Sequence, residues 1–240
     1  MLTVRSCIKS AMSKNYLFAG ASSAIALQTA SMLQHDGHQV FGISTKPLSE
    51  GYNQSFLVER YSQGFFPVLE QPLDGLVYFP GTINLKPFNR LTPADFTRDY
   101  EINALGAAMF IQQYLPNLKK SEQASIVLIS SVAASLGLPF HGSISMAKAA
   151  LEGLTRALAA ELAPSIRVNC IAPSLVDTPL ASKFVDTDEK RDQLAKRNPL
   201  RKIGSASDVA GMVSLLLRDE SQWITGQILA VDGGMGTLKL

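Results

Sequence analysis

Short apolar runs alternate along this chain with stretches of helical periodicity, and this alternation is the feature that most restricts its fold. Strands are expected at residues 16–19, 39–43, 76–79, 125–129, 167–171 and 227–231. Because helical patterns fall between these runs, successive strands are joined by crossovers and lie parallel in one sheet. The sequence therefore predicts an α/β protein with a doubly wound parallel sheet of about seven strands and helices on both faces.

Local signals refine this outline. Thr92, Pro93 and Asp95 combine an N-cap, a first-turn proline and a carboxylate at capping-box spacing, which predicts a helix start. The chain between the second and third apolar runs is short for a doubly wound sheet. We expect a strand at residues 54–58 and a short helix around residues 61–70, with one crossover helix reduced to a loop.

Length, charge and cysteine content exclude several classes. The 240 residues contain no linker, repeat or low-complexity tract, so we expect one domain at 15–240 after a disordered extension at 1–14. The net charge is +2 and no block of Lys and Arg occurs, which argues against nucleic acid as a partner. No apolar run is long enough to cross a membrane. Cys7 and Cys170 lie far apart without metal-ligand spacing, which predicts a reduced, cytoplasmic protein without a metal site.

The segment from Ser131 to Lys148 carries the strongest chemical signal. Its spacing resembles the short-chain dehydrogenase/reductase family, in which Ser is followed after 13 residues by Tyr and after four more by Lys. Ser131 and Lys148 match this pattern, but Ile144 stands at the Tyr position and has no proton to give or take. We expect position 144 to line an open cleft rather than the packed core.

The resemblance extends over residues 16–234. Residues 19–26 read Ala-Gly-Ala-Ser-Ser-Ala-Ile-Ala, where the family has Thr-Gly-x-x-x-Gly-x-Gly. Gly81 remains from the family's Asn-Asn-Ala-Gly, Asn103 matches its helical asparagine, and residues 231–234 read Val-Asp-Gly-Gly as in the family. The chain is most similar to members of the 3-oxoacyl-acyl carrier protein reductase type, and the resemblance implies a single-domain Rossmann fold.

The resemblance also implies catalytic roles. Ser131 would orient a substrate carbonyl, Lys148 would hold the nicotinamide ribose, and Asn103 would hold a water that relays protons to Lys148. Either His141 or water would replace the missing Tyr as proton donor. His141 lies seven residues before Lys148, the spacing of the Tyr in enoyl reductases, although a solvent-facing loop histidine explains it as well.

The implied cofactor is NADP(H). A site that prefers NAD places an acid after the second strand, whereas Ser44, Thr45 and Lys46 offer two hydroxyls and a cation there. A solvated loop also explains Lys46. The expected cofactor-binding residues are Gly20, Ser22, Ser23, Ala24, Ile25, Ser44, Thr45, Lys46, Pro80, Gly81, Lys148, Pro173, Val176 and Thr178.

Two functions remain open at this point. One is an NADP(H)-dependent oxidoreductase of a small-molecule carbonyl or acyl-thioester substrate, whose active site lacks the Tyr. The other is a catalytically silent relative that binds the cofactor or serves as a subunit partner. A basic lid at residues 180–198 would suit an anionic substrate, although acidic residues in the same segment offset its charge. A homo-oligomer, namely a tetramer, is expected because small residues accompany the leucine stripe of the helix at residues 145–163: Ala149, Ala150, Ala157, Ala159 and Ala160.

Overall fold

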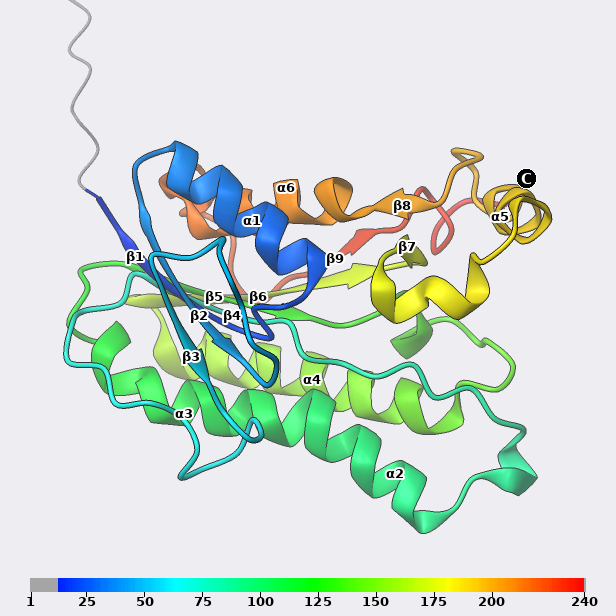
Figure 1. Ribbon diagram of the computed structural model, residues 1–240, viewed down its shortest axis with the longest axis horizontal. Helices are drawn as coiled ribbons and strands as arrows, with labels where there is room; N and C mark the ends of the chain where they lie inside the picture. The colour runs from blue at the N-terminus through cyan, green and yellow to red at the C-terminus, as the bar shows by residue number, and fades with distance from the viewer. Residues whose placement is uncertain (1–12, 240) are drawn as a thin grey trace, which may run out of the picture.

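The computed structural model describes residues 13–239 as an α/β fold built on one parallel sheet (Figure 1). Seven strands lie in the order β3-β2-β1-β4-β5-β6-β9, and every neighbouring pair is parallel. Their bounds are β1 Asn15–Ala19, β2 Gln39–Ser44, β3 Gln54–Leu57, β4 Gly75–Tyr78, β5 Ala124–Ile129, β6 Ile166–Pro173 and β9 Ile228–Val231. The predicted fold class is confirmed, because this is a doubly wound Rossmann-like sheet.

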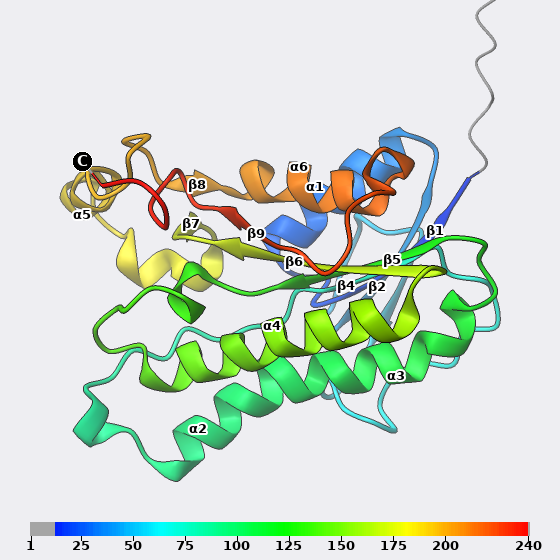
Figure 2. The same ribbon diagram turned by 180° about the vertical axis from the view of Figure 1, so that it is seen from behind.

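Helices cover both faces of the sheet (Figures 1 and 2). Helices α1 (Ala24–His35) and α6 (Ala206–Leu217) pack side by side on one face. The other face carries α4 (Gly142–Leu162) and a continuous helix formed by α2 (Pro93–Tyr100), the π-helical turn η2 (Glu101–Leu105) and α3 (Gly106–Leu118). The helix α4 begins three residues before the predicted bound of 145.

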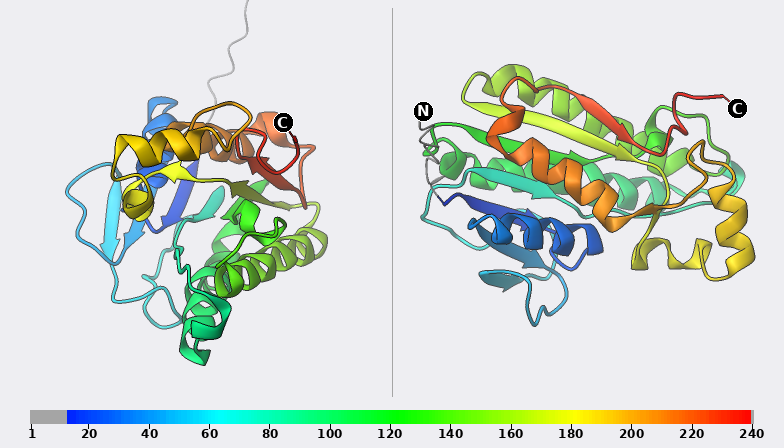
Figure 3. Two further views of the ribbon diagram at one scale, coloured as in Figure 1. Left: turned by 90° about the vertical axis from the view of Figure 1, so that its right-hand side faces the viewer. Right: turned by 90° about the horizontal axis from the view of Figure 1, so that it is seen from above.

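Short elements gather beyond the carboxyl ends of the strands (Figure 3). They are η1 Phe88–Arg90, η3 Val132–Ala134, η4 Pro179–Phe184 and α5 Asp188–Ala195, with the small strand pair β7 Val176–Asp177 and β8 Gly204–Ser205. Another short helix, η5 Asp219–Ser221, follows α6. Because ligands of such sheets bind at the carboxyl ends of the strands, these elements surround the expected site.

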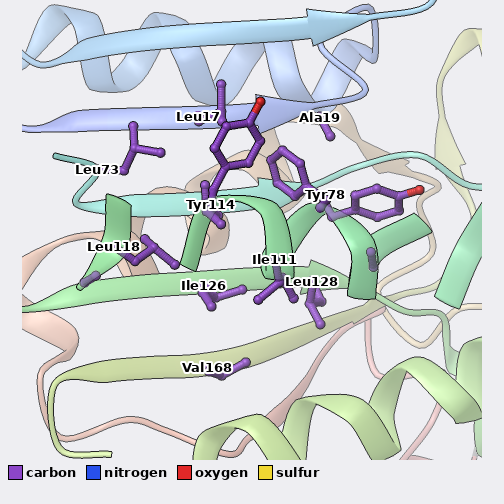
Figure 4. Packing of buried hydrophobic residues seen from close by; sticks show 14 of the residues in the cluster. Leu17, Ala19, Leu73, Tyr78, Ile111, Tyr114, Leu118, Ile126, Leu128 and Val168 are labelled. Carbon is purple, nitrogen blue, oxygen red and sulfur yellow. The ribbon is translucent and has the colours of Figure 1, made fainter. Parts of the chain in front are cut away.

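Successive side chains of β1 point to opposite faces of the sheet and pack in two separate hydrophobic cores. Leu17 and Ala19 pack with the residues under α3 and α4, whereas Tyr16 and Phe18 pack with those under α1 and α6. Successive side chains of a strand point to opposite faces, and all four are buried. Figure 4 shows the first core, in which Leu17 and Ala19 meet side chains of α3 such as Tyr114.

The predicted capping box is confirmed. Thr92 and Asp95 exchange side-chain-to-backbone hydrogen bonds at 3.4 and 2.9 Å, and Pro93 is the first residue of α2. A cap of this kind contributes about 1 kcal/mol to helix stability.

The predicted short helix around residues 61–70 is wrong. The strand at 54–58 forms as β3, but the chain then runs to β4 through turns without a helix in residues 61–70. Side chains of α3 provide the reason, because they satisfy the backbone carbonyls of this loop. Tyr114 donates to the carbonyl of Pro67 at 2.7 Å, and Asn117 donates to that of Leu69 at 2.8 Å. The expected loss of one crossover helix is therefore found in this loop.

Two residues of the expected N-terminal extension contact the folded domain. The Ser13 hydroxyl donates to the carbonyl of Gly37 at 2.8 Å, and the Lys14 ammonium forms an ion pair with Asp219. These contacts attach both residues to the folded domain. The remainder of the predicted extension, residues 1–12, lies outside the described residues.

Candidate functional site

The sheet order places one crevice where the chain changes direction. The strands β1 and β4 are neighbours, and the crossovers that leave them run to opposite sides of the sheet. A crevice at the carboxyl ends of such a pair is the binding position in doubly wound folds. Of the predicted site residues, Gly20 follows β1 directly, Ser44 ends β2, and Pro80 and Gly81 follow β4. Ser131 lies just after β5 and Pro173 ends β6, so one edge of the sheet carries them all.

The turn after β1 requires its glycine. Gly20 has φ of +75°, and a Cβ there would lie 2.8 Å from Cδ of Pro80. A side chain at this position would therefore be strained and would collide with the loop after β4. Ser23 is the N-cap of α1 without a side-chain capping bond, which leaves the first-turn N–H groups available to an anion. Ser22 is exposed, whereas Ala24 and Ile25 are partly buried in the first turn of the helix.

The three residues predicted to favour NADP(H) differ in exposure at the end of β2. Thr45 and Lys46 are exposed, but Ser44 is 1% exposed and its hydroxyl accepts a bond from the Lys46 N–H at 3.0 Å. The Ser44 side chain therefore shapes the turn. The exposed donors at this end of the strand are Thr45 and Lys46.

Asn103 and Lys148 converge beside Gly81. A Cβ at Gly81 would lie 3.2 Å from Oδ1 of Asn103 and 3.3 Å from Nζ of Lys148. Oδ1 of Asn103 is buried without a hydrogen-bond partner in the described part of the chain. Buried polar atoms are nearly always paired, so this oxygen marks a position for a water or a bound group.

Lys148 is held in the site by a backbone carbonyl. Its Nζ donates to the carbonyl of Ile129 at 2.7 Å, and the residue is 6% exposed. Burial lowers the pKa of Lys148 to about 8, against the opposing influence of Cys170 and Asp99. Burial also raises the pKa of the Cys170 thiol to about 12, so this thiol is neutral near pH 7 and Asp99 is the physically relevant counter-charge.

A π-helical turn positions Asn103. The turn η2 interrupts the helix that runs from Pro93 to Leu118, and the hydroxyl of Tyr78 donates to the carbonyl of Ile102 at 2.7 Å. Turns of this type leave backbone groups without their usual helical partners and occur often at functional sites. Tyr78, at the end of β4, thus supplies a side-chain hydrogen bond to the π turn.

A buried carboxylate joins the two helices next to this site, and the sequence reasoning missed it. Asp99 is 1% exposed and accepts bonds from the hydroxyls of Thr82 and Ser143, each at 2.6 Å. Asn84 donates to it at 3.2 Å, and Asn103 donates to Thr82 at 2.9 Å. The available signal was spacing, because Asp99 lies four residues before Asn103 and shares its helix face.

Ser131 and Ile144 differ in exposure. Ser131 is partly buried, and its hydroxyl accepts the N–H of Ala133 at 3.2 Å as the N-cap of η3. Ile144 is only 4% exposed, so the expectation that position 144 lines an open cleft is wrong. Helix α4 packs against α2, η2 and η3, and position 144 is buried rather than open.

His141 lies at the start of α4. Its Nδ1 is 2.7 Å from the carbonyl oxygen of Pro139, and the ring makes no side-chain cap to the helix. Within residues 13–239, no hydrogen bond joins His141 to Ser131, Asn103 or Lys148. Its part in proton transfer stays a hypothesis.

The remaining predicted residues border the lid. Pro173 and Val176 are buried, and Thr178 is the N-cap of η4. A cavity of about 500 Å³ opens here, lined by Asp177, Thr178, Pro179, Ser182, Val185, Asp186 and Arg191. Arg191 pairs with Asp177 at 2.5 Å and Lys190 with Asp186 at 2.7 Å. Two cations of the segment thus already have partners.

Among residues 13–239, no cluster of His, Cys, Asp and Glu could hold a metal ion. In that same part of the chain, no helix combines the length and the apolar character needed to span a bilayer.

The doubly wound sheet and the glycine turn at its crevice are typical of dinucleotide-binding α/β proteins. A family model described as Enoyl-(Acyl carrier protein) reductase matches residues 66–236. An Arabidopsis thaliana protein named as a tropinone reductase homolog is 32% identical over 91% of this chain and 89% of its own length. The chain belongs to the short-chain dehydrogenase/reductase family.

Other relatives agree with this placement. Dehydrogenase/reductase SDR family member 4 of Mus musculus is 37% identical, over 55% of this chain and 48% of its own length. The match thus spans about half of that relative. The structure of Thermoplasma acidophilum aldohexose dehydrogenase superposes with a TM-score of 0.85 at 26% identity, covering 95% of both chains. A structure titled ElxO with NADP bound gives a TM-score of 0.82 at 25% identity, over 95% of this chain and 100% of that one.

Proposed function

We propose that this chain is an NADP(H)-dependent oxidoreductase of carbonyl substrates whose active site lacks the usual tyrosine. The observation that carries the proposal is the convergence of Asn103 Oδ1 and Lys148 Nζ beside Gly81. A buried ammonium and an unpaired buried amide oxygen are costly, and a retired site would have no reason to keep them. The NADP bound in the structure of ElxO supports the choice of cofactor.

The residues present fit such a cofactor. The turn at Gly20 and the uncapped start of α1 would receive the pyrophosphate, and Thr45 and Lys46 the 2′-phosphate. Lys148 would donate to the nicotinamide ribose, while Pro80, Val176 and Thr178 would border the rest of the bound dinucleotide. When bound, the nicotinamide supplies or accepts the hydride. Ser131 would orient the substrate carbonyl with its hydroxyl.

The proton route follows from what replaces the tyrosine. Ile144 cannot donate, so the proton comes either from His141 or from water held by Asn103 Oδ1 next to Lys148. A positioned acid contributes about 10²–10⁴-fold to rate. Ordinary ketone reduction should therefore be slow when water alone is the donor.

A turnover assay tests the proposed function. Purified protein is offered NADPH with a panel of ketones and enoyl thioesters, and Lys148→Met is the control for contaminating reductases. Turnover that disappears in Lys148→Met supports an oxidoreductase. Binding of NADPH without turnover of any substrate favours the alternative, a silent cofactor-binding relative. The observation that supports this alternative is the buried Ile144 at the position expected for the tyrosine.

We expect NADPH to bind at least about tenfold more tightly than NADH. Thr45 and Lys46 are exposed at the end of β2, and each charge-assisted hydrogen bond contributes roughly 1.5–3 kcal/mol. Isothermal titration with both cofactors measures the ratio, and Lys46→Ala should reduce it severalfold. Lys120→Ala, which removes a lysine bonded to the carbonyl of Glu70, is the matched control. Equal dissociation constants for NADPH and NADH would contradict this preference.

The substrate class stays broad. The pairing of Lys190 and Arg191 with acids reduces the positive charge that the lid offers to an acyl carrier protein or another anion. An acyl thioester is thus one member of the panel rather than the favoured substrate. We also propose that the protein is cytoplasmic and that its cysteines are reduced, since Cys170 is free and buried.

We expect a homotetramer in solution. Ala149, Ala150, Ala157 and Ala160 are exposed along α4, whereas Ala159 is 5% exposed and packs in the core, contrary to its predicted place in the contact face. An exposed row of small side chains lets a second helix approach closely. Multi-angle light scattering at micromolar concentration should give about four times the 25.9 kDa chain mass. A mass of one chain would contradict the expected assembly.

A further inference from the structure

The crevice at the ends of β1 and β2 contains a side chain that none of the proposed roles uses. Tyr61 lies in the loop between β3 and β4, and the Thr45 N–H donates to its hydroxyl at 3.3 Å. Burial raises the pKa of Tyr61, and the hydrogen bond from Thr45 opposes that rise. The Tyr61 hydroxyl therefore takes up a backbone donor at the end of β2, the strand that pairs with β1 and its glycine turn.

This donor is one of the proposed binding groups for the adenosine half of the cofactor. The glycine turn approaches the phosphates, and the residues at the end of the second strand contact the adenosine ribose or its 2′-phosphate. The Tyr61 hydroxyl now accepts the hydrogen bond from Thr45 that a ribose or phosphate oxygen would otherwise accept. Two oxygens cannot share this position.

We infer that Tyr61 occupies the adenosine-ribose subsite of the free protein and must leave it before the dinucleotide binds. The inference rests on the proposed function and adds a residue that sets cofactor affinity. Tyr61 acts as an internal competitor, because its hydroxyl accepts the Thr45 N–H that the ligand would use. Its occupancy of the subsite reduces the apparent affinity for the dinucleotide, because only molecules with an open subsite can bind it.

The packing around Tyr61 is compatible with such a movement. Its ring meets Tyr78 edge-to-face at a centroid distance of 6.1 Å, and its carbonyl oxygen lies 3.1 Å from where a Cβ at Gly106 would be. The residue is partly buried and belongs to a segment of turns rather than to a strand or helix. The side chain can therefore rotate outward without unpairing a backbone ladder.

Removing only the hydroxyl gives the sharpest test. Tyr61→Phe keeps the ring but removes the bonds that hold it in the subsite, so 2′,5′-ADP and NADPH should bind about five- to tenfold more tightly. Nicotinamide mononucleotide, which lacks the adenosine half, should bind as it does to wild type. Tyr114→Phe is the matched control, since its hydroxyl donates to Pro67 in the same core and lies outside the glycine turn and the end of β2.

Isothermal titration of the three proteins with the three ligands separates the outcomes. Tighter 2′,5′-ADP binding by Tyr61→Phe alone supports the inference, as does binding by Tyr61→Phe where wild type shows none. Unchanged or weaker binding overturns it, because the hydroxyl would then be neutral or a ligand of the ribose. If none of the three proteins binds NADPH or 2′,5′-ADP, both the proposed function and the inference fail. If wild type binds but Tyr61→Phe does not bind more tightly, only the inference fails.

Discussion

Gly106→Ala should destabilise the protein by about 2–4 kcal/mol, which is large for the addition of one methyl group. A Cβ at Gly106 would overlap the Tyr78 hydroxyl and lie 3.1 Å from the carbonyl oxygen of Tyr61. Tyr78 is 1% exposed and packs against the ring of Phe110 at a centroid distance of 5.9 Å, so its hydroxyl cannot move aside freely. Any displacement also breaks its 2.7 Å bond to the carbonyl of Ile102.

A matched glycine separates this collision from helix propensity. Gly211 lies exposed in α6, and a Cβ there would meet nothing within 4 Å. Gly211→Ala should therefore stabilise the protein by about 0.5–1 kcal/mol through helix propensity alone. Urea denaturation followed by circular dichroism gives both values.

A double-mutant cycle identifies the colliding atom. Tyr78→Phe alone should cost about 1–3 kcal/mol, because it leaves a carbonyl of the π turn unsatisfied. In that background the cost of Gly106→Ala should fall by more than half, since the overlapping oxygen is gone. Additive effects of the two substitutions would show that the collision lies elsewhere.

The strands and caps could be predicted because they depend on local patterns. The apolar run of β1 and the Thr92–Asp95 box each determine structure through neighbours within a few residues. The prediction of a helix around residues 61–70 failed for the opposite reason, because this loop depends on distant residues. Its conformation is set by hydrogen bonds from Tyr114 and Asn117, which lie in a helix about fifty residues later.

The candidate site was predictable only where spacing within one segment decides it. Lys148 and Asn103 were found from motif spacing, and the structure brings both beside Gly81. Asp99 and Tyr61 were missed because their importance comes from partners in other elements, such as Ser143 in α4 and Thr45 after β2. Hydrogen bonds between distant segments leave no periodic signal in the chain.

The burial of position 144 also could not be predicted from local sequence spacing. A residue four positions before Lys148 shares its helix face, which suggested a place in the cleft. Helix α4 packs against α2, η2 and η3, which come from other parts of the chain, and the Ser143–Asp99 hydrogen bond joins α4 to α2. The periodicity of α4 by itself could not specify that packing.

Ile144→Tyr should raise ketone reduction by NADPH on the order of 10²-fold over wild type. Ser131, Asn103 and Lys148 keep the spacing that similar sequences combine with a tyrosine. A hydroxyl at position 144 would lie on the same helix face as Lys148, whose pKa burial lowers to about 8, so most molecules carry the ammonium at pH 7. That positive charge would stabilise the phenolate left after proton donation.

Burial adds a cost to this substitution. Ile144 is 4% exposed, so a larger ring should reduce the free energy of unfolding by about 1–3 kcal/mol. Ile144→Phe is the matched control, because it adds a ring of nearly the same size without the hydroxyl. Both variants should lose similar stability in thermal denaturation, and only Ile144→Tyr should gain activity.

The kinetic comparison decides between the two proton sources. A slow wild type with a fast Ile144→Tyr, and no change in His141→Ala, identifies the missing hydroxyl as the limiting group. A fast wild type whose activity is lost in His141→Ala instead identifies the imidazole as the donor. Equal, slow rates for Ile144→Tyr and Ile144→Phe, with NADPH binding intact, would contradict the prediction. The hydroxyl would then be unable to reach the substrate from a buried position.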